Sequence, residues 1–275
     1  MILMHPNARY AQVPLVEPAT HGFFLMAIQT GRPTFPVRPI ANSDWLRGLK
    51  EITAPSFDSG LVTSARLYQA VGRPPLKGLP ALPHQVDLLR RAQADVVLLL
   101  ETPSRTALEI VVESPWLGAI RRWVSKGTRL VHEIPTYVAR QVGIDPIPPR
   151  SLSLFNFFAA EDDATFLTVW EYLADWYRVE MGLDHAYLLM SDGRPSDYAG
   201  VTYATWGGTV AQFIAKQLTK STFRSYVLAN LRAHEVAIMP TLFRPIHAWE
   251  SKREAYNDPA FNNGNVKGEE KNERI

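Results

Sequence analysis

The feature that most constrains this chain is the order of its apolar patterns in the stretch 151–245. Alternation of apolar residues is typical of strands, and apolar spacings of three and four are typical of helices. The patterns predict six elements in turn: strand 151–160, a helix from Asp163 that ends at Gly182, strands 185–192 and 198–206, a helix from Thr209, and a strand from His234. Strand, helix, strand, strand, helix, strand is the order of the ferredoxin-like βαββαβ unit.

The preceding residues follow the same order with more interruptions. We expect strand 21–31, a proline-rich loop 32–41, a helix 45–53 capped by 42–44, a second helical piece 59–72, a proline- and glycine-rich excursion 72–83, a short helix 84–94, strands 95–101 and 107–114, a helix from Pro115 to Gly127, and strand 128–139. Prolines in the loop and the excursion exclude helices and central strands there.

These patterns predict five segments. They are an N-terminal arm 1–20, a first half 21–139, a linker 140–150 that contains three prolines, a second half 151–249, and a polar tail 250–275. The two halves match in the order of their elements and barely in their residues. We interpret them as an internal duplication of topology.

Composition excludes several classes of function. The chain has 275 residues, no cysteine and a net charge of +2. Disulfides, thiolate metal sites and a cysteine nucleophile are therefore excluded, and the charge gives no reason to expect nucleic acid as a partner. No window reaches the roughly 18 apolar residues that a membrane span needs, and the N-terminus lacks the pattern of a signal peptide. We expect a cytoplasmic protein that binds a small molecule, and we leave homo-oligomerisation open.

The second half resembles the antibiotic-biosynthesis monooxygenase family of the dimeric α/β-barrel superfamily. The resemblance covers about 95 residues and depends on soft patterns: the first strand LFNFF, the tryptophan-rich helix FLTVWEYLADWYRVEMG, the passage MGLDHAYLLMS, the aromatic strand VTYATW and the helix ending TKSTFRSYV. The first half matches only in element order.

The resemblance implies an α+β fold in which two ferredoxin-like βαββαβ units form a dimeric α/β-barrel-type fold. Helices on one face of a four-stranded sheet leave the other face bare, and these strands are apolar on both faces. Two units in one chain would cover each other. We therefore expect an intramolecular barrel that encloses an aromatic-lined chamber.

The resemblance also implies oxidation of a small hydrophobic phenolic or polyketide-like substrate with dioxygen, often without a cofactor. The heme-degrading branch of the family uses an asparagine on its first strand, and Asn156 aligns with it. That branch also uses a tryptophan and a heme-ligating histidine on the second helix. Those positions fall near Gln217 and Val227, which cannot take these roles.

Three polar residues are our candidates for catalysis. Asn156 interrupts the apolar first strand of the second half, and His185 and Tyr187 alternate onto one face of the next strand. An amide could hold a phenol, and an imidazole that titrates near neutrality could act as its base. A core asparagine and a surface histidine are the alternative interpretations.

Five aromatic residues are candidate walls of the substrate pocket: Trp170, Tyr172, Trp176, Tyr203 and Trp206. Each is equally a candidate for the core. Tyr203 and Trp206 are expected on opposite faces of their strand, because their positions differ by three, an odd number.

The sequence predicts no metal site and no cofactor. The seven histidines show no HxxxH, HExxH or HxH spacing, and neither GxGxxG nor GxxxxGK[ST] occurs. Heme and flavin remain open. The alternatives to an oxygenase are a heme enzyme of the same superfamily, such as the aldoxime dehydratases and chlorite dismutases, a non-oxidative lyase or cyclase, and a ligand-binding protein without catalysis.

Overall fold

The structure is a computed structural model that describes residues 3–31, 37, 43–54, 60–74, 79–144, 150, 152–191 and 197–250. The strands are β1 (Gly22–Gln29), β2 (Ser64–Gly72), β3 (Val96–Thr102), β4 (Leu130–Val142), β5 (Leu152–Ala159), β6 (Ala186–Ser191), β7 (Gly200–Trp206) and β8 (Ala237–Glu250). They close into one antiparallel barrel in the order β1-β3-β2-β8-β5-β7-β6-β4.

The barrel consists of two four-stranded sheets with the same internal order. The first half is arranged β4-β1-β3-β2 and the second β8-β5-β7-β6. The halves join at two seams, where β2 pairs with β8 and β4 pairs with β6. The expected α+β fold and the closure of the barrel within one chain are therefore confirmed.

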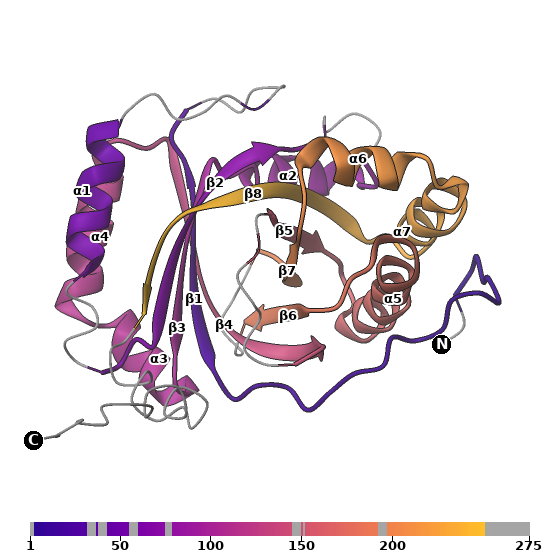
Figure 1. Cartoon of the computed structure of the whole chain (residues 1–275), viewed down its shortest axis with the longest axis horizontal. Helices are drawn as coiled ribbons and strands as arrows, with labels where there is room; N and C mark the ends of the chain where they lie inside the picture. Colours follow the sequence, from indigo (N-terminus) through magenta and orange to yellow (C-terminus); the bar gives the residue numbers. More distant parts are fainter. Residues whose placement is uncertain are drawn as a thin grey trace, which may run out of the picture.

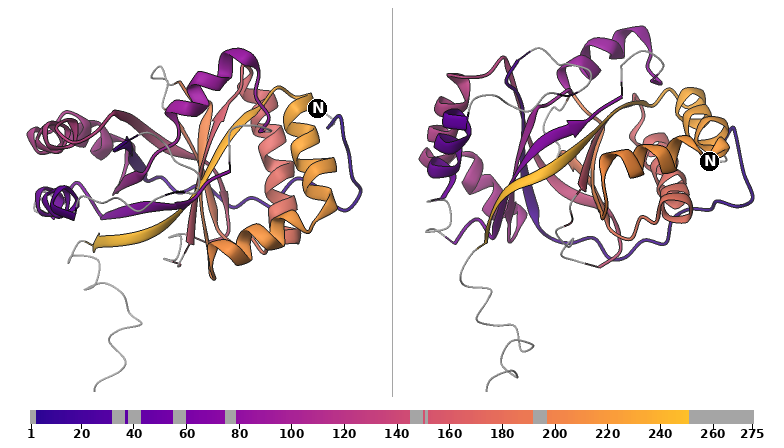
Figure 2. Two further views of the ribbon diagram at one scale, coloured as in Figure 1. Left: turned by 90° about the horizontal axis from the view of Figure 1, so that it is seen from above. Right: turned by 45° about the horizontal axis from the view of Figure 1, so that its top comes forward.

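The helices lie outside the barrel on two opposite sides (Figures 1 and 2). One side carries α1 (Ser43–Thr53), α3 (Arg105–Val112) and α4 (Pro115–Ser125). The other carries α5 (Asp163–Trp176), α6 (Val210–Leu218), α7 (Ala229–Ala233) and two π-helical segments, η3 (Tyr177–Met181) and η4 (Phe223–Leu228). The 3₁₀ turn η2 (Pro83–Gln85) and α2 (Val86–Arg91) follow β2, and Leu89 of α2 packs into the core of the lumen.

The lumen of the barrel is packed with side chains. Phe23, Tyr68, Phe155, Tyr203 and Phe243 converge there, and each is at most 2% exposed. Phe155 stacks on Tyr203 with ring centroids 5.0 Å apart, and Phe243 meets Phe155 edge-on at 5.4 Å. The expectation of an open chamber inside the barrel is therefore wrong, because aromatic side chains from both halves fill the space.

Two elements of the first half differ from the sequence-based expectation. The stretch expected to be a second helical piece contains β2, in which Ala65 and Leu67 face the helices while Tyr68 and Ala70 face the lumen. Both faces carry buried apolar residues, and the polar Ser64, Arg66 and Gln69 are interspersed among them, so the two-residue period is hidden.

Residues 107–112 of the expected strand 107–114 belong instead to the helix α3. Ser104 caps it by accepting a hydrogen bond from the Ala107 amide, and Leu108, Val111 and Val112 form its buried stripe. The β-branched residues of this stretch favoured a strand, but the cap and the three- and four-residue spacing decide the structure. In one case a strand replaces an expected helix, and in the other a helix replaces an expected strand. The overall βαββαβ order of the first half is therefore unchanged.

Some expected segment boundaries differ from the structure, and some expected segments lie outside the described residues. β4 continues to Val142, three residues into the expected linker. Loop 32–41 apart from Val37, most of turn 193–197, and the tail beyond Glu250 lie outside the described residues.

The N-terminal arm lies along the helical side of the second half. The Tyr10 hydroxyl donates to Glu180 Oε1 at 2.8 Å and lies 3.1 Å from Thr222 Oγ1. Arg9 and Lys220 each form an ion pair with Glu180 at 2.9 Å. Since Glu180 lies in η3 and Thr222 immediately precedes η4, the arm connects the two π-helical segments.

The Glu180 carboxylate gives this attachment a dependence on pH. Although burial favours the neutral acid, hydrogen bonds from Lys220 and Tyr10 lower the pKa of Glu180 below its ordinary value. An acid whose pKa is lowered on folding contributes stability above its unfolded pKa, about 4.3 for glutamate, and that contribution is lost as the pH falls through the folded pKa.

We expect the difference in unfolding free energy between the wild type and Glu180→Gln to shrink as the pH falls below about 4. Urea denaturation at a series of pH values measures it. Glu109→Gln, at an exposed position on α3, serves as the control and should change little. A difference for Glu180→Gln that stays constant with pH would contradict the assignment of an ionised Glu180.

Candidate functional site

A small cavity lies between the sheet of the second half and α5, on the helix-facing side of the barrel wall. Its volume is about 40 Å³, and Asn156, Trp170, Tyr177, Thr202 and Trp206 contribute its polar atoms. The remaining lining is apolar: Leu154, Phe158, Leu173, Ala174, Leu183, Ala186, Ala204, Val227, Leu231 and Ile238. We call it the inner cavity.

Strand alternation places the polar atoms of the inner cavity. On β5, Phe155 and Phe157 face the lumen, so Asn156 between them faces the helices. Asn156 is directly opposite Thr202 on β7, which accepts a hydrogen bond from Trp170 Nε1 at 2.8 Å. Thr202 and Trp170 therefore bond to each other, and neither forms this bond with Asn156.

Two of the residues that line the inner cavity have a polar atom with no hydrogen-bond partner among the described residues. These atoms are Asn156 Oδ1, which is buried, and the indole Nε1 of Trp206, whose side chain is also buried. One accepts and the other donates a hydrogen bond. Leaving such groups buried and unpaired costs about 1–3 kcal/mol each, so a site of this kind is suited to a ligand that supplies the missing bonds.

A second cavity adjoins the first at the seam between β2 and β8. Its volume is about 310 Å³, and it shares Leu154, Tyr177 and Ile238 with the inner cavity. Its other lining residues come from the end of β2 and its loop, β8, α6 and η4: Gly72, Arg73, Pro74, Leu79, Phe213, Ile214, Gln217, Leu218, Phe223, Leu228, Pro240 and Leu242. We call it the outer cavity, and its lining is mostly apolar.

The two π-helical segments contribute to both cavities. Tyr177 belongs to η3, and Val227, Phe223 and Leu228 belong to η4. π-Helical turns in proteins occur frequently at functional sites. The Tyr177 hydroxyl accepts a hydrogen bond from Gln217 Nε2 at 3.0 Å, and burial raises the pKa of this phenol well above its ordinary value. Tyr177 is therefore a neutral phenol.

The structure brings together three of the residues selected from the sequence. Asn156, Trp170 and Trp206 all line the inner cavity. Tyr172 and Trp176 do not line either cavity: Tyr172 packs against the same core, and Trp176 is buried with its Nε1 donating to Thr222 Oγ1 at 3.0 Å. Their predicted role as walls has no support in the geometry.

The three predicted catalytic residues, Asn156, His185 and Tyr187, do not lie together in the structure. Tyr187 and Tyr203 belong to the lumen, on the opposite face of the sheet from Asn156, and their ring centroids are 6.4 Å apart. His185 precedes β6, where its Nδ1 lies beside Gly143 at the end of β4. Because the sheet separates Asn156 from Tyr187, these residues cannot contact one substrate together.

Sequence reasoning missed Thr202, Tyr177 and Gln217. Thr202 could have been found, since it lies on the same face of its strand as Trp206, four residues away. Tyr177 lies inside the helix that the sequence predicts from Asp163 to Gly182, and the change from α-helical to π-helical geometry after Trp176 has no clear sequence signal. Gln217 was considered only for a heme-related role.

On the equivalent face of the first half, Phe24 and Met26 of β1 and Leu98 and Leu100 of β3 are apolar. These residues are fully buried under α1, α3 and α4. The polar Asn156 and Thr202 of the second half therefore differ from these apolar positions of the first half.

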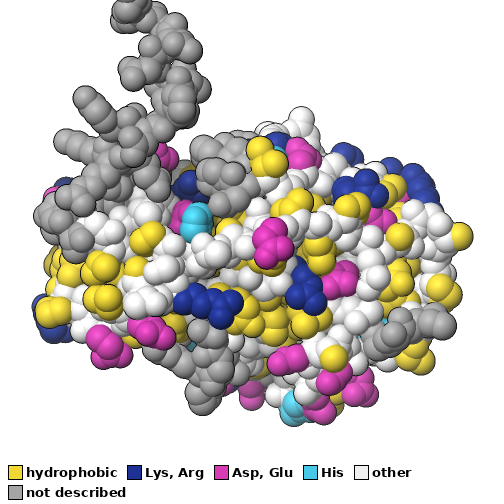
Figure 3. All heavy atoms as spheres, turned by 90° about the horizontal axis from the view of Figure 1, so that it is seen from below, with side chains coloured by type: hydrophobic (Ala, Val, Ile, Leu, Met, Phe, Trp, Pro, Cys, Tyr) yellow, Lys and Arg dark blue, Asp and Glu magenta, His cyan; other side chains and the backbone are white. Residues whose placement is uncertain are grey.

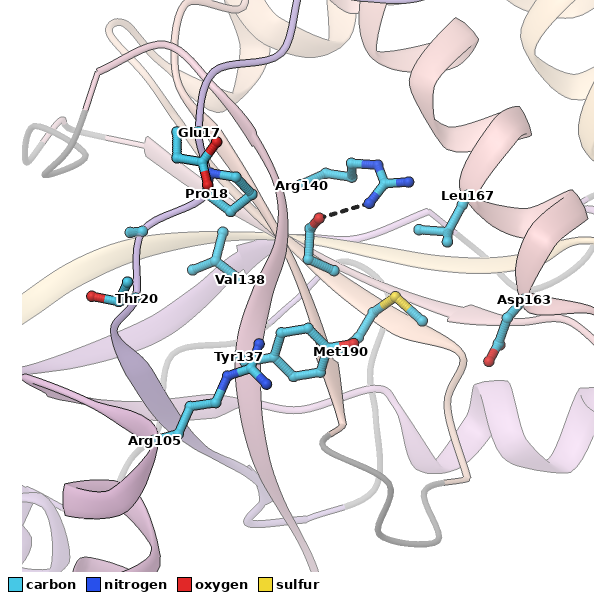
Figure 4. A pocket seen from close by; sticks show the side chains of 12 residues that line it. Glu17, Pro18, Thr20, Arg105, Tyr137, Val138, Arg140, Asp163, Leu167 and Met190 are labelled. Atoms are coloured by element: carbon cyan, nitrogen blue, oxygen red, sulfur yellow. Dashed lines mark hydrogen bonds between the residues drawn. The ribbon is translucent and has the colours of Figure 1, made fainter.

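A broader groove of about 750 Å³ lies at the other seam, where β4 meets β6 (Figure 4). Its sides come from the arm, α3 and α5, and Arg105 lies over the ring of Tyr137 at 4.0 Å. Arg140 is engaged by Glu171 at 2.7 Å. Seen from below, this side of the molecule carries apolar side chains with basic ones beside them (Figure 3). None of the residues selected from the sequence lines this groove.

Comparisons with known proteins bear on the fold. No family model and no curated protein matches the sequence. An anthrone oxidase-like protein of known structure aligns with a TM-score of 0.59 at 12% identity, over 87% of this chain and 97% of that chain. A candidate monooxygenase from Fusobacterium nucleatum subsp. nucleatum aligns at 0.52 and 9% identity, over 85% and 95%.

The fold is of the dimeric α/β-barrel type. A heme-binding protein from Thermus thermophilus also aligns, with a TM-score of 0.45 at 14% identity over 90% of this chain and 98% of that chain. At such identities the likeness concerns the fold alone.

Within the described ranges, no helix could span a bilayer and no cluster of three metal-binding side chains occurs.

Two neighbouring positions test whether Asn156 serves the core or a ligand. We expect Asn156→Leu to raise the free energy of unfolding by about 1–2 kcal/mol, because it removes an unpaired buried amide and fills apolar space. Thr202→Val, the matched control directly opposite, should lower it by about 1 kcal/mol, because Trp170 Nε1 loses its acceptor. Chemical denaturation measures both. A destabilised Asn156→Leu protein would assign Asn156 to the core.

Proposed function

We propose that the protein is a monooxygenase-like oxidoreductase that oxidises a small hydrophobic aromatic compound in the inner and outer cavities. One observation carries the proposal: the inner cavity is apolar, and its unpaired polar atoms are one acceptor, Asn156 Oδ1, and one donor, Trp206 Nε1. A phenol or enol can donate to the first, and its ionised oxygen can accept from the second.

The composition of the cavities favours this chemistry over acid–base catalysis. Their described lining includes no Asp, Glu, His or Lys, and Arg73 is engaged by Asp95 at 2.9 Å. A site without a general base suits a substrate that has already released its proton to solvent water when it enters. Indole and amide N–H donors stabilise the resulting anion in a dry environment.

The electron-rich anion then reacts with dioxygen. In the balanced reaction, an activated CH₂ group between aromatic rings becomes C=O. One oxygen atom of O₂ enters the product, and the other leaves as water with the two hydrogens. The chain contributes binding, exclusion of water and stabilisation of the anion.

A heme does not fit the same residues. Heme iron is usually held by histidine, cysteine, methionine or tyrosine. The described lining of the two cavities contains only Tyr177 of these types, and that phenol has a raised pKa and is hydrogen-bonded to Gln217. The described lining of these cavities therefore offers heme iron no suitable ligand.

Anthrone is a suitable probe, because it has an activated CH₂ group between two aromatic rings and a ketone that enolises. We expect oxygen uptake with one O₂ consumed per anthrone. Asn156→Ala should lower kcat/KM about 10- to 100-fold, which corresponds to losing a hydrogen bond to a charged group of about 1.5–3 kcal/mol. An oxygen electrode measures this.

Leu167→Ala provides the matched control, because Leu167 is on α5 but lines the groove at the other seam. It should retain the wild-type kcat/KM. Absence of oxygen uptake across anthrone and simple phenols would refute the oxygenase proposal.

A ligand-binding protein without catalysis is the second candidate, and the lack of acid–base groups in the cavities favours it. It predicts saturable quenching of tryptophan fluorescence by anthrone without oxygen uptake. A lyase or cyclase has no comparable support.

We further propose that the two halves arose by duplication. The shared order of strands, β4-β1-β3-β2 and β8-β5-β7-β6, supports this origin.

A further inference from the structure

We propose that the Tyr177 side chain is a movable partition between the inner and outer cavities, and that the ligand is an elongated apolar molecule with one polar end that passes it. This inference rests on the proposed function for the location of the site. It adds the shape of the ligand and the residue that controls entry.

The sizes of the cavities require a ligand that occupies both. The inner cavity, at about 40 Å³, has room for about one water molecule, whose share of liquid volume is roughly 30 Å³. The outer cavity, at about 310 Å³, lies at the lower end of the range for small-molecule pockets. An aromatic body therefore fits only the outer cavity.

The polarity of the cavities orients that ligand. The outer cavity is mostly apolar, whereas the unpaired atoms Asn156 Oδ1 and Trp206 Nε1 belong to the inner one. A molecule with its apolar body in the outer cavity and one oxygen in the inner cavity would satisfy both requirements.

Tyr177 is the movable element of the boundary. The cavities share Leu154, Ile238 and Tyr177, and the first two belong to paired strands of the closed barrel. Tyr177 comes from the π-helical segment η3. Displacing a strand residue would disturb the ladder, but a tyrosine can change rotamer without moving the backbone.

The forces that hold Tyr177 are weak enough to be exchanged for ligand contacts. Its hydroxyl accepts one hydrogen bond, from the neutral Gln217 at 3.0 Å, and a bond between two neutral groups is among the weaker kinds. Its ring meets Trp176 at 5.0 Å and Trp206 at 6.3 Å between centroids. The neutral phenol forms no ion pair that would fix it.

The rim of the outer cavity is suited to the entry of an apolar ligand. Ile214 and Leu218 of α6 line this cavity, and they are 39% and 60% exposed. Two large apolar side chains exposed beside an apolar cavity indicate the side from which such a molecule enters.

Quenching of Trp206 fluorescence by trichloroethanol, a small apolar quencher, tests the partition without any substrate. The contribution of Trp206 is the difference between each protein and its Trp206→Phe counterpart. We expect Tyr177→Ala to raise the quenching rate constant roughly tenfold, the factor for removing a barrier of about 1.4 kcal/mol. Gln217→Leu should give a smaller increase, and Leu167→Ala on the neighbouring helix should give none.

Anthrone supplies the second readout. Tyr177→Ala should accelerate its association, followed by stopped-flow tryptophan fluorescence, while phenol, with one ring and no extended body, should bind weakly to every variant. Quenching in Tyr177→Ala and Gln217→Leu that stays at the wild-type rate overturns the partition.

The two proposals fail separately. Faster quenching in Tyr177→Ala without any oxygen uptake by the wild type refutes the oxygenase and leaves the partition standing. Oxygen uptake by the wild type with unchanged quenching and association in Tyr177→Ala refutes the partition and leaves the oxygenase standing.

Discussion

The mutual burial of two apolar sheet faces is the interaction on which this structure depends. Each half is a four-stranded sheet with helices on one side, and alone it would expose a face bearing Phe23, Tyr68, Phe155 or Tyr203. Hydrogen bonding at the β2–β8 and β4–β6 seams closes the barrel and removes every sheet edge. The aromatic side chains of the two halves then pack against one another in the lumen.

Filling the lumen determines where a ligand can bind. Because the interior is occupied, the cavities lie at the seams and under the helices of the second half. There Asn156 Oδ1 and Trp206 Nε1 have no hydrogen-bond partner in the described part of the chain, whereas the neighbouring Thr202 and Trp170 bond to each other. Unpaired groups of this kind reduce stability, and the balance between stability and activity at functional sites gives a physical reason for their presence.

Much of the fold could be predicted from the sequence because the second half has clear periods. The tryptophan stripe of α5 and the alternation in β5 and β7 indicate their structures directly. In the first half, β2 is buried on both faces and α3 is rich in β-branched residues. The local sequence patterns therefore predict a helix in place of β2 and a strand in place of α3. The predicted order of elements is still correct, because the two errors exchange one helix and one strand.

The site could be predicted less well, for a geometrical reason. Asn156 and Trp206 stood out as a polar break and an aromatic strand end, and both line the inner cavity. Tyr187 and Tyr203 look equally suitable in the sequence but face the lumen. Which face of a strand meets the helices depends on the packing of the whole barrel. The π-helical turn that directs Tyr177 toward the cavities likewise has no pattern in the sequence.

The central claim is that the working cavity lies outside the barrel, between the second sheet and its helices. A crystal structure of the protein soaked with anthrone tests this most directly. The account predicts density for the rings in the outer cavity, with the oxygen atom in hydrogen-bonding range of Asn156 or Trp206. Density among Tyr68, Tyr187 and Tyr203 in the lumen, or only in the groove beside Arg105 and Tyr137, would contradict it.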